Sequence, residues 1–195
     1  MTWRPGTAFG LQDNDLKSFS VGVDVAPSDV VGLGLSYGFE NYATLQRSRQ
    51  ASPGVQFNDP TRDWSTDMNE DVHTFTASLE LAQVTAKTSA RIAYDLVRSN
   101  ATYLYLLPAN STLAVPQQLP PVENDLRRAT ADVRYAVSRQ VAIGLGYAYD
   151  RYDVEDFARS PGTLNSPVFA TFVNLMYQSR PYDAHTGSLR LIYTW

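Results

Sequence analysis

The sequence predicts an all-β fold, an antiparallel up-and-down transmembrane β-barrel of about seven or eight strands. Several segments alternate apolar residues with small or polar ones, which is the period of a β-strand. The connections between these segments are alternately short and long, as in outer-membrane barrels with tight periplasmic turns and long external loops. The chain also ends on an alternating segment whose last residue is aromatic, Trp195.

The composition fits this class and excludes others. No run approaches the ~20 apolar residues of a membrane helix, and a net charge of −4 gives no basic surface for nucleic acid. The chain has no Cys, which excludes disulfides, thiolate metal sites and covalent c-type haem attachment within it. No Ser, His and Asp spacing suggests a hydrolase, so we expect no catalytic residue, no metal site and no cofactor.

Residues 1–15 are polar, contain Pro5, Gly6 and Gly10, and predict a loop. This stretch has no apolar region of the kind found in a signal peptide. Since an exported barrel needs such a signal, we expect residues 1–195 to be one barrel segment, the C-terminal arc of a larger barrel.

Six alternating segments predict strands. Their apolar positions run over Phe19–Val25, Val31–Phe39, Phe75–Leu81, Ala90–Leu96, Ala129–Tyr135 and Val141–Tyr149. The intervening positions are small or polar, and two segments carry repeated glycines there. A soluble sandwich would leave few glycines on its outward face, whereas a barrel lumen accepts them, so we assign the apolar face to lipid. Short connections lie at 26–29, 83–87 and 137–140, and long ones at 43–70 and 107–124.

Residues 156–183 are harder to interpret. The apolar positions within 168–176 follow helical spacing, and Ser166 and Pro167 suit a helix start, so we expect a short helix at 167–177 in an external loop. A further strand there is the alternative. The helix gives seven strands and leaves Trp195 on the periplasmic side, whereas single-chain bacterial barrels have an even number of strands.

The last segment places Leu189, Leu191, Tyr193 and Trp195 on one face, with Ile192 the exception. Such an ending resembles the targeting signal of outer-membrane barrels. We therefore expect Leu191, Tyr193 and Trp195 to form a membrane-insertion signal for the barrel-assembly machinery, and outer-membrane lipid to surround the apolar face.

Charged residues on the polar face are expected to face the lumen, where they would line a pore or contact a protein plug. They are Asp24, Glu40, Arg91, Asp95, Arg128, Asp132, Arg134, Asp150 and Arg190. Aromatic residues toward the external ends suit an interface girdle, and packing beneath the loops is the alternative for several of them. They are Tyr37, Phe39, Tyr42, Tyr94, Tyr147, Tyr149 and Tyr152.

Two acidic groups could in principle bind calcium, but their spacing matches no EF-hand and favours solvated loops. They are Asp59, Asp63, Asp67, Glu70 and Asp71, and Asp150, Asp153, Glu155 and Asp156. The two histidines, His73 and His185, lie near the external ends of predicted strands and are expected to be hydrogen-bonded rim residues rather than zinc ligands.

Several stretches resemble the MtrB/PioB family of decahaem-cytochrome-associated outer-membrane barrels, and the likeness covers most of residues 12–195. The stretches are Phe57–Asp67 with Val72–Phe75, Leu119–Leu126, Leu145–Asp156, and Tyr182–His185. The resemblance implies a large barrel that ensheathes a multihaem c-type cytochrome, so that electrons cross the outer membrane to or from extracellular acceptors or donors such as iron. The barrel itself would insulate and position the haems.

Three other interpretations remain open. A small self-contained barrel with a structural or adhesion role would need a strand at 168–177. A general diffusion porin would need an inward-folded constriction loop with opposed charges. A soluble sandwich would leave the glycine-lined strand faces unexplained.

Overall fold

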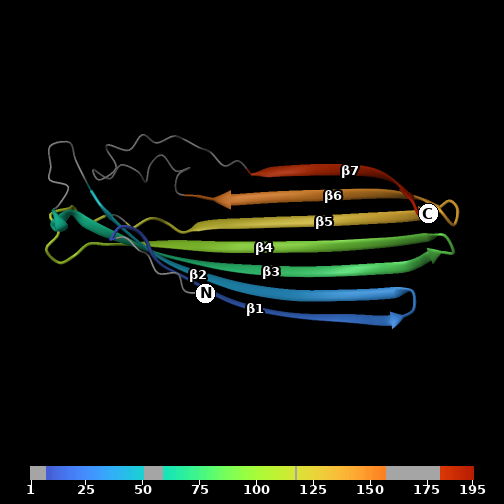
Figure 1. Cartoon of the computed structure of the whole chain (residues 1–195), viewed down its shortest axis with the longest axis horizontal. Helices are drawn as coiled ribbons and strands as arrows, with labels where there is room; N and C mark the ends of the chain where they lie inside the picture. Colours follow the sequence, from blue (N-terminus) through green and yellow to red (C-terminus); the bar gives the residue numbers. More distant parts are fainter. Residues whose placement is uncertain (1–7, 51–58, 117, 157–180) are drawn as a thin grey trace.

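The computed structural model describes residues 8–50, 59–116, 118–156 and 181–195, which form one antiparallel sheet of seven strands (Figure 1). The strands are β1 (Gly10–Ser28), β2 (Val31–Arg49), β3 (Asp63–Thr85), β4 (Thr88–Leu106), β5 (Val122–Ala136), β6 (Val141–Glu155) and β7 (Tyr182–Tyr193), and the 3₁₀ helix η1 (Pro60–Arg62) precedes β3. Each strand pairs with its sequence neighbours, which is the predicted up-and-down order. The all-β, antiparallel prediction is confirmed.

The short connections all lie at one end of the sheet, beside the C-terminus (Figure 1). They are the turns between β1 and β2, between β3 and β4, and between β5 and β6. The connections between β2 and β3 and between β4 and β5 lie at the opposite end, as predicted. We call these the turn end and the loop end.

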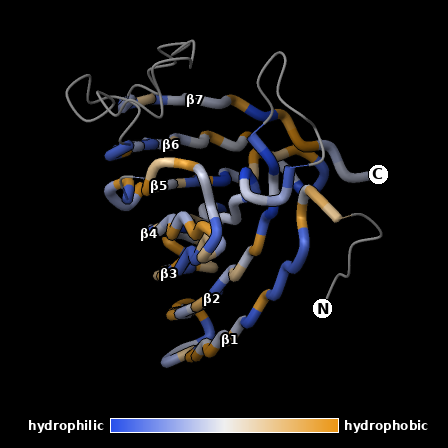
Figure 2. The backbone as a smooth tube through the Cα atoms, turned by 90° about the vertical axis from the view of Figure 1, so that its left-hand side faces the viewer, coloured by the Kyte–Doolittle hydropathy of each residue, from blue (hydrophilic) through white to orange (hydrophobic). Residues whose placement is uncertain are grey.

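Viewed along the strands, the sheet is an open arc with β1 and β7 at its two edges (Figure 2). Among the described residues no strand pairs with the free side of either edge strand, so the sheet is not closed. No helix in the described part of the chain is long and apolar enough to span a membrane.

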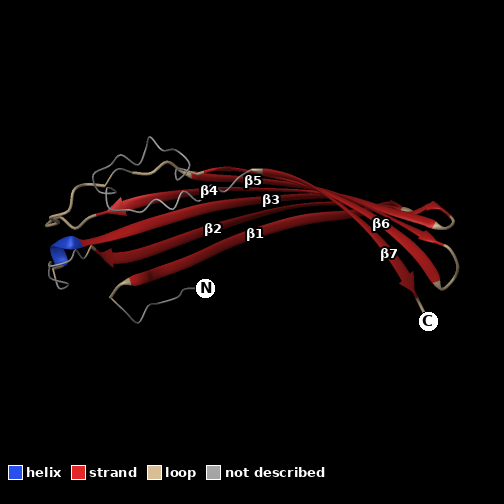
Figure 3. Cartoon of the chain, turned by 90° about the horizontal axis from the view of Figure 1, so that it is seen from above, coloured by secondary structure: helices blue, strands red, loops and turns tan. Residues whose placement is uncertain are grey.

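The strands run without interruption from the turn end to the loop end (Figure 3). They are longer than predicted, because β1, β2 and β3 continue toward the loop end after the apolar alternation has stopped. The prediction of a loop at residues 1–15 is wrong for residues 10–15, because β1 begins at Gly10, which pairs with Arg47. Likewise, β2 and β3 continue through much of the loop expected at 43–70. Both faces of these extensions carry polar residues, so the backbone ladder persists where the hydropathy pattern gives no sign of a strand. The helix expected at 167–177, and its alternative strand, lie outside the described residues.

The first three strands are repeated by the last three. Residues 12–42 and 122–152, which include β1–β2 and β5–β6, align without a gap and have turns of the same length. The identical pairs are Asn14/Asn124, Asp15/Asp125, Leu16/Leu126, Val23/Val133, Ala26/Ala136, Ser28/Ser138, Val31/Val141, Gly34/Gly144, Leu35/Leu145, Tyr37/Tyr147 and Tyr42/Tyr152. The likeness extends into the following strand, where Asp71 and His73 of β3 correspond to Asp183 and His185 of β7. A β1–β4 unit is therefore followed by a second copy of its first three strands.

The sheet has two unlike faces and little enclosed core. Among the described residues, only Ala101, Ala142 and Val154 are buried hydrophobic positions. The large apolar side chains lie exposed on one face, with Leu189 74% and Leu191 77% exposed. Water is an unfavourable solvent for a continuous surface of this kind, so this face requires an apolar environment.

Candidate functional site

The polar face gathers every charged residue that the sequence analysis assigned to it. The register places all of them on one side of the sheet: Asp24, Glu40, Arg91, Asp95, Arg128, Asp132, Arg134, Asp150 and Arg190. Glu80 shares this face and lies opposite Arg91, which in turn lies opposite Asp132. Glu80 was not among the predicted site residues, although the same alternation identifies it.

Neighbouring strands compensate several of these charges across the sheet. The Arg128 Nε donates to Asp150 Oδ1 at 2.5 Å. Arg190 of β7 forms an ion pair with Asp132 of β5, although β6 lies between the two strands. The Thr76 hydroxyl donates to Asp95 Oδ1 at 2.8 Å. Such pairing lowers the cost of placing charges on a surface that is only partly hydrated.

Glycines on the polar face make room for these side chains. A Cβ on Gly146 would lie 2.5 Å from Ser188 Oγ and 3.0 Å from Asp132 Oδ1. A Cβ on Gly34 would lie 2.7 Å from both Asp24 Oδ1 and Ser78 Oγ. Polar groups of the flanking strands thus lean over the glycines, which is the crowding expected on the inner side of a curved sheet.

The predicted aromatic girdle is divided between the two faces. Tyr37, Phe39, Tyr94, Tyr147 and Tyr149 share the apolar face. Inclusion of Tyr42 and Tyr152 was wrong, because both occupy positions of opposite parity, on the polar face. There the Tyr42 hydroxyl donates to Glu40 Oε2 at 2.9 Å, and the Tyr152 hydroxyl donates to Asn124 Oδ1 at 2.6 Å.

Both histidines are hydrogen bonded on the apolar face, in the same arrangement. The Tyr37 hydroxyl lies 2.8 Å from His73 Nδ1, and the Tyr147 hydroxyl lies 2.7 Å from His185 Nδ1. A second aromatic ring, two positions beyond the tyrosine on the same strand, also contacts each imidazole. The ring centroids of Phe39 and His73 lie 5.1 Å apart, and those of Tyr149 and His185 lie 5.0 Å apart. The prediction of hydrogen-bonded histidines is confirmed, but His73 lies in the middle of β3 rather than near its end, because β3 extends toward the loop end.

The first acidic group does not converge on one point. Asp59 caps η1 by accepting from the Thr61 backbone N–H at 3.0 Å. Asp63 is 3% exposed and is bound by Arg49 and by Arg47, whose Nη2 lies 2.7 Å from its Oδ2. The Arg49 guanidinium, and then that of Arg47, lowers the pKa of the Asp63 carboxyl below its ordinary value. The described part of the chain contains no group of three His, Cys, Asp or Glu residues arranged to hold a metal ion.

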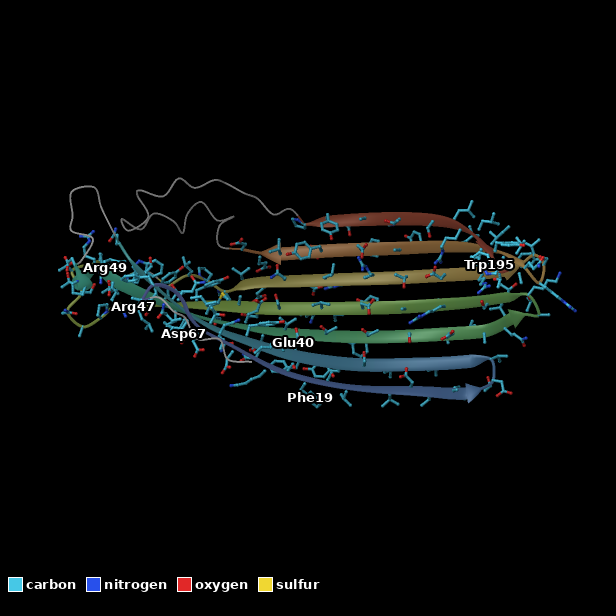
Figure 4. All side chains as sticks on the ribbon, viewed as in Figure 1. Phe19, Glu40, Arg47, Arg49, Asp67 and Trp195 are labelled. Atoms are coloured by element: carbon cyan, nitrogen blue, oxygen red, sulfur yellow. The ribbon has the colours of Figure 1, made fainter. Side chains whose placement is uncertain are left out.

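The two ends of the sheet carry different features (Figure 4). Arg47 and Arg49 lie at the loop end, and Trp195 lies beside the turns. Trp195 is 98% exposed, and the preceding Thr194 backbone N–H donates to the Gln140 carbonyl at 2.9 Å. The proposed insertion signal therefore presents its last ring at the turn end, free of packing against the described residues.

Three arginines on the apolar face were missed by the sequence analysis: Arg98, Arg127 and Arg151. Counted outward from the turns, they come directly after Leu96 of β4, Ala129 of β5 and Tyr149 of β6 on that face. Counting outward from each turn would have found them at matching positions. Alternation of apolar residues does not reach these positions, because it stops where the apolar residues end.

The chain was compared with known proteins at the level of sequence and of structure. The model of a family described as an outer-membrane β-barrel porin family, MtrB/PioB, matches residues 5–195. The comparisons with curated proteins and with solved structures each found no match.

Proposed function

We propose a function from the premise that the chain belongs to the MtrB/PioB family of outer-membrane β-barrel porins. It is a porin-like protein of the bacterial outer membrane, and its family is a barrel family rather than an enzyme family. Its open seven-stranded sheet fits part of such a barrel.

Within this class, the protein sheathes and positions a multihaem c-type cytochrome in its lumen, so that electrons cross the outer membrane. The family match carries this proposal. The apolar face then contacts lipid, and the polar face, with Asp95, Arg128 and Asp150 in one transverse row, contacts the cytochrome. The chain has no Cys for covalent c-type haem attachment, so all covalently held haem would belong to the partner.

The polar face suits a protein partner in two respects. Its ion pairs are formed within the sheet, as between Arg128 and Asp150, so a partner can dock without leaving those charges unpaired. Small residues run across the middle of the face in the row Gly34, Ser78, Ala93, Thr130, Ala148 and Thr186. Such a row lets another protein surface approach the backbone closely.

Co-purification tests the proposal. The full chain, tagged and produced in its native host, is extracted from the outer membrane, and covalent haem is stained on gels of the purified complex. We expect a haem protein to accompany the wild type. Ala148→Trp, which adds bulk to the central row, should reduce the haem signal several-fold. Ala129→Trp, on the opposite face of β5, is the matched control and should leave the haem signal unchanged.

The absence of any haem protein from the wild-type preparation would contradict the sheath. A polar face could also line a diffusion pore, so the same preparation is tested for conductance in planar bilayers. Steady conductance by protein that carries no cytochrome would favour the porin alternative.

A further inference from the structure

On every strand the apolar face of the sheet becomes charged or amidic toward the loop end. The residues at this boundary are Lys17, Asn41, Asp71, Arg98, Arg127, Arg151 and Asp183. On β2, for example, the uncharged stretch of this face runs from Val31 to Phe39. Its length matches the ~9–11 residues with which a tilted strand crosses a bilayer. The boundary therefore marks where the hydrocarbon layer ends on the loop side.

Three adjacent strands place an arginine at this boundary. Arg127 of β5 lies directly opposite Arg151 of β6, and like charges in opposed positions repel. Each bonds along its own strand, Arg127 Nε to Asp125 Oδ1 and Arg151 Nε to Asp153 Oδ2, both at 2.8 Å. Since Asp125 and Asp153 also oppose each other, the like-charge contacts are not removed by this pairing.

The third arginine completes one basic cluster. Arg98 Nε donates to Asp125 Oδ2 at 2.9 Å, so Asp125 holds both Arg98 and Arg127. The arginine side chains are the more exposed partners, at 59% for Arg98 and 41% for Arg127 against 22% for Asp125. All three arginines line one surface hollow, together with His73. We name Arg98, Arg127 and Arg151 the arginine triad.

Five acidic residues also line the hollow; Asp71 lies at the same boundary, and Asp125 lies opposite Arg98. Glu123 and Glu155 occupy the next positions on this face beyond Asp125 and Asp153. The outermost positions on this face are therefore acidic, whereas arginines and carboxylates lie side by side at the level of the triad. An anion between Arg127 and Arg151 meets two guanidinium groups at its own level, with Asp125 and Asp153 at the next positions outward.

We propose that the arginine triad binds the phosphate of an anionic lipid headgroup in the outer leaflet of the membrane. Guanidinium groups bind phosphate through paired N–H donors, and an anion between Arg127 and Arg151 relieves their repulsion. Aromatic residues such as Tyr94 and Tyr149 lie just inside the triad and suit the layer below the headgroup. The inference rests on the membrane orientation in the proposed function, with the apolar face toward lipid, and not on the cytochrome.

Lipid retention tests this site. The full chain is purified in detergent with its folding checked by heat-dependent gel mobility, and it is then equilibrated with lipid A, a bisphosphorylated glycolipid, or with its dephosphorylated form. We expect the wild type to retain lipid A and Arg127→Gln/Arg151→Gln to retain at least tenfold less. Arg139→Gln, the same charge change in the turn between β5 and β6, is the matched control and should retain lipid A like the wild type. Arg127→Lys/Arg151→Lys keeps the charge but loses the paired donors, so it should fall between the two and provides a second folded variant.

The other outcomes separate the sources of the signal. Equal retention by the wild type and the Gln variant would overturn the proposal. Equal retention of the dephosphorylated lipid would assign binding to apolar contact, and complete displacement of lipid A by millimolar inorganic phosphate would assign a free-anion site; either result would also overturn it. Haem staining of the same variants should match the wild type, so loss of the cytochrome and loss of the lipid are read independently.

Discussion

Arg49, the last residue of β2, lies opposite Asp63, the first residue of β3, and their side chains form an ion pair that closes the loop end of this hairpin. A second bond, from Arg49 Nη2 to Asp63 Oδ2, measures 3.2 Å. The Arg62 backbone carbonyl also accepts from the Gln50 backbone N–H at 3.0 Å. β2 and β3 therefore stay paired toward the loop end, well beyond the bilayer boundary at Asn41 and Asp71.

This ion pair predicts a pH dependence at the loop end. Because Arg49 lowers the pKa of Asp63, the ionised carboxylate is favoured in the folded protein. The contribution of the Asp63 carboxylate to stability is complete above its unfolded pKa of about 3.9. This contribution is lost as the pH falls through the lower pKa that the group has in the folded protein. Limited proteolysis of the β2–β3 connection should therefore be slow at neutral pH and accelerate below about pH 4. Asp63→Asn should be cleaved faster at neutral pH, whereas Asp67→Asn, at an exposed position of the same strand, should behave like the wild type.

The assignment of the two faces predicts opposite tolerance at adjacent positions. Leu35→Arg places a charge on the apolar face and should impair assembly, at a cost of about 2–4 kcal/mol if the residue lies at the bilayer midplane. Ser36→Arg, on the polar face, should be tolerated much better. The fraction of heat-resistant folded protein in membranes measures both variants. Equal defects would contradict the assignment.

The crowding over Gly34 predicts that the stability cost of a side chain at this position depends on Ser78. Gly34→Ala pushes a methyl group against Asp24 and Ser78 and should cost about 1 kcal/mol. Gly32→Ala, whose nearest contact would be Glu80 Cβ at 3.6 Å, is the control and should be close to neutral. Adding Ser78→Ala to Gly34→Ala should recover part of the loss. Urea unfolding in vesicles gives the three values, and strict additivity would count against this contact.

The repeated tyrosine–histidine pairs predict equal effects in the two halves of the chain. Tyr37→Phe and Tyr147→Phe each remove one hydrogen bond to an imidazole and should each lower the free energy of unfolding by about 0.5–1.5 kcal/mol. The same urea titration compares them. A cost confined to one variant would show that the two sites are not equivalent.

The exposed C-terminal residue predicts an effect on insertion alone. Trp195 makes no packing that its deletion would remove from the described sheet, since it is 98% exposed. Deletion of Trp195 should nevertheless reduce the protein recovered in the outer membrane while synthesis continues. Trp195→Phe keeps a terminal aromatic ring and should insert normally. Normal insertion of the deletion variant would argue against a terminal signal.

The sequence predicted the membrane-spanning part of the sheet well, because lipid on one side makes every second residue apolar. Alternation therefore placed Val31–Phe39 and Val141–Tyr149 in strands and put Asp95 and Arg128 on the polar face. It failed where water lies on both sides of the sheet. There, residues 10–15 pair by backbone hydrogen bonds that leave no mark on the hydropathy pattern.

Contacts between strands were beyond this kind of prediction for another reason. The ion pair between Arg190 and Asp132 reaches across β6, so it depends on side-chain conformations that hydropathy alternation does not encode. Tyr42 and Tyr152 were misplaced although their parity could be counted, because their aromatic character suggested the girdle. Position along the strand was the better guide there than residue type.

The directions of the edge strands have a consequence for closure. β1 and β7 both run from the loop end to the turn end, whereas neighbours in an antiparallel barrel run in opposite directions. These two edges are therefore not each other's neighbours in such a barrel. β7 repeats β3, and the corresponding side of β3 is occupied by β4, so a strand of the β4 kind is the matching neighbour for β7. The duplication thus relates the free edge of β7 to the edge of β3 that β4 occupies.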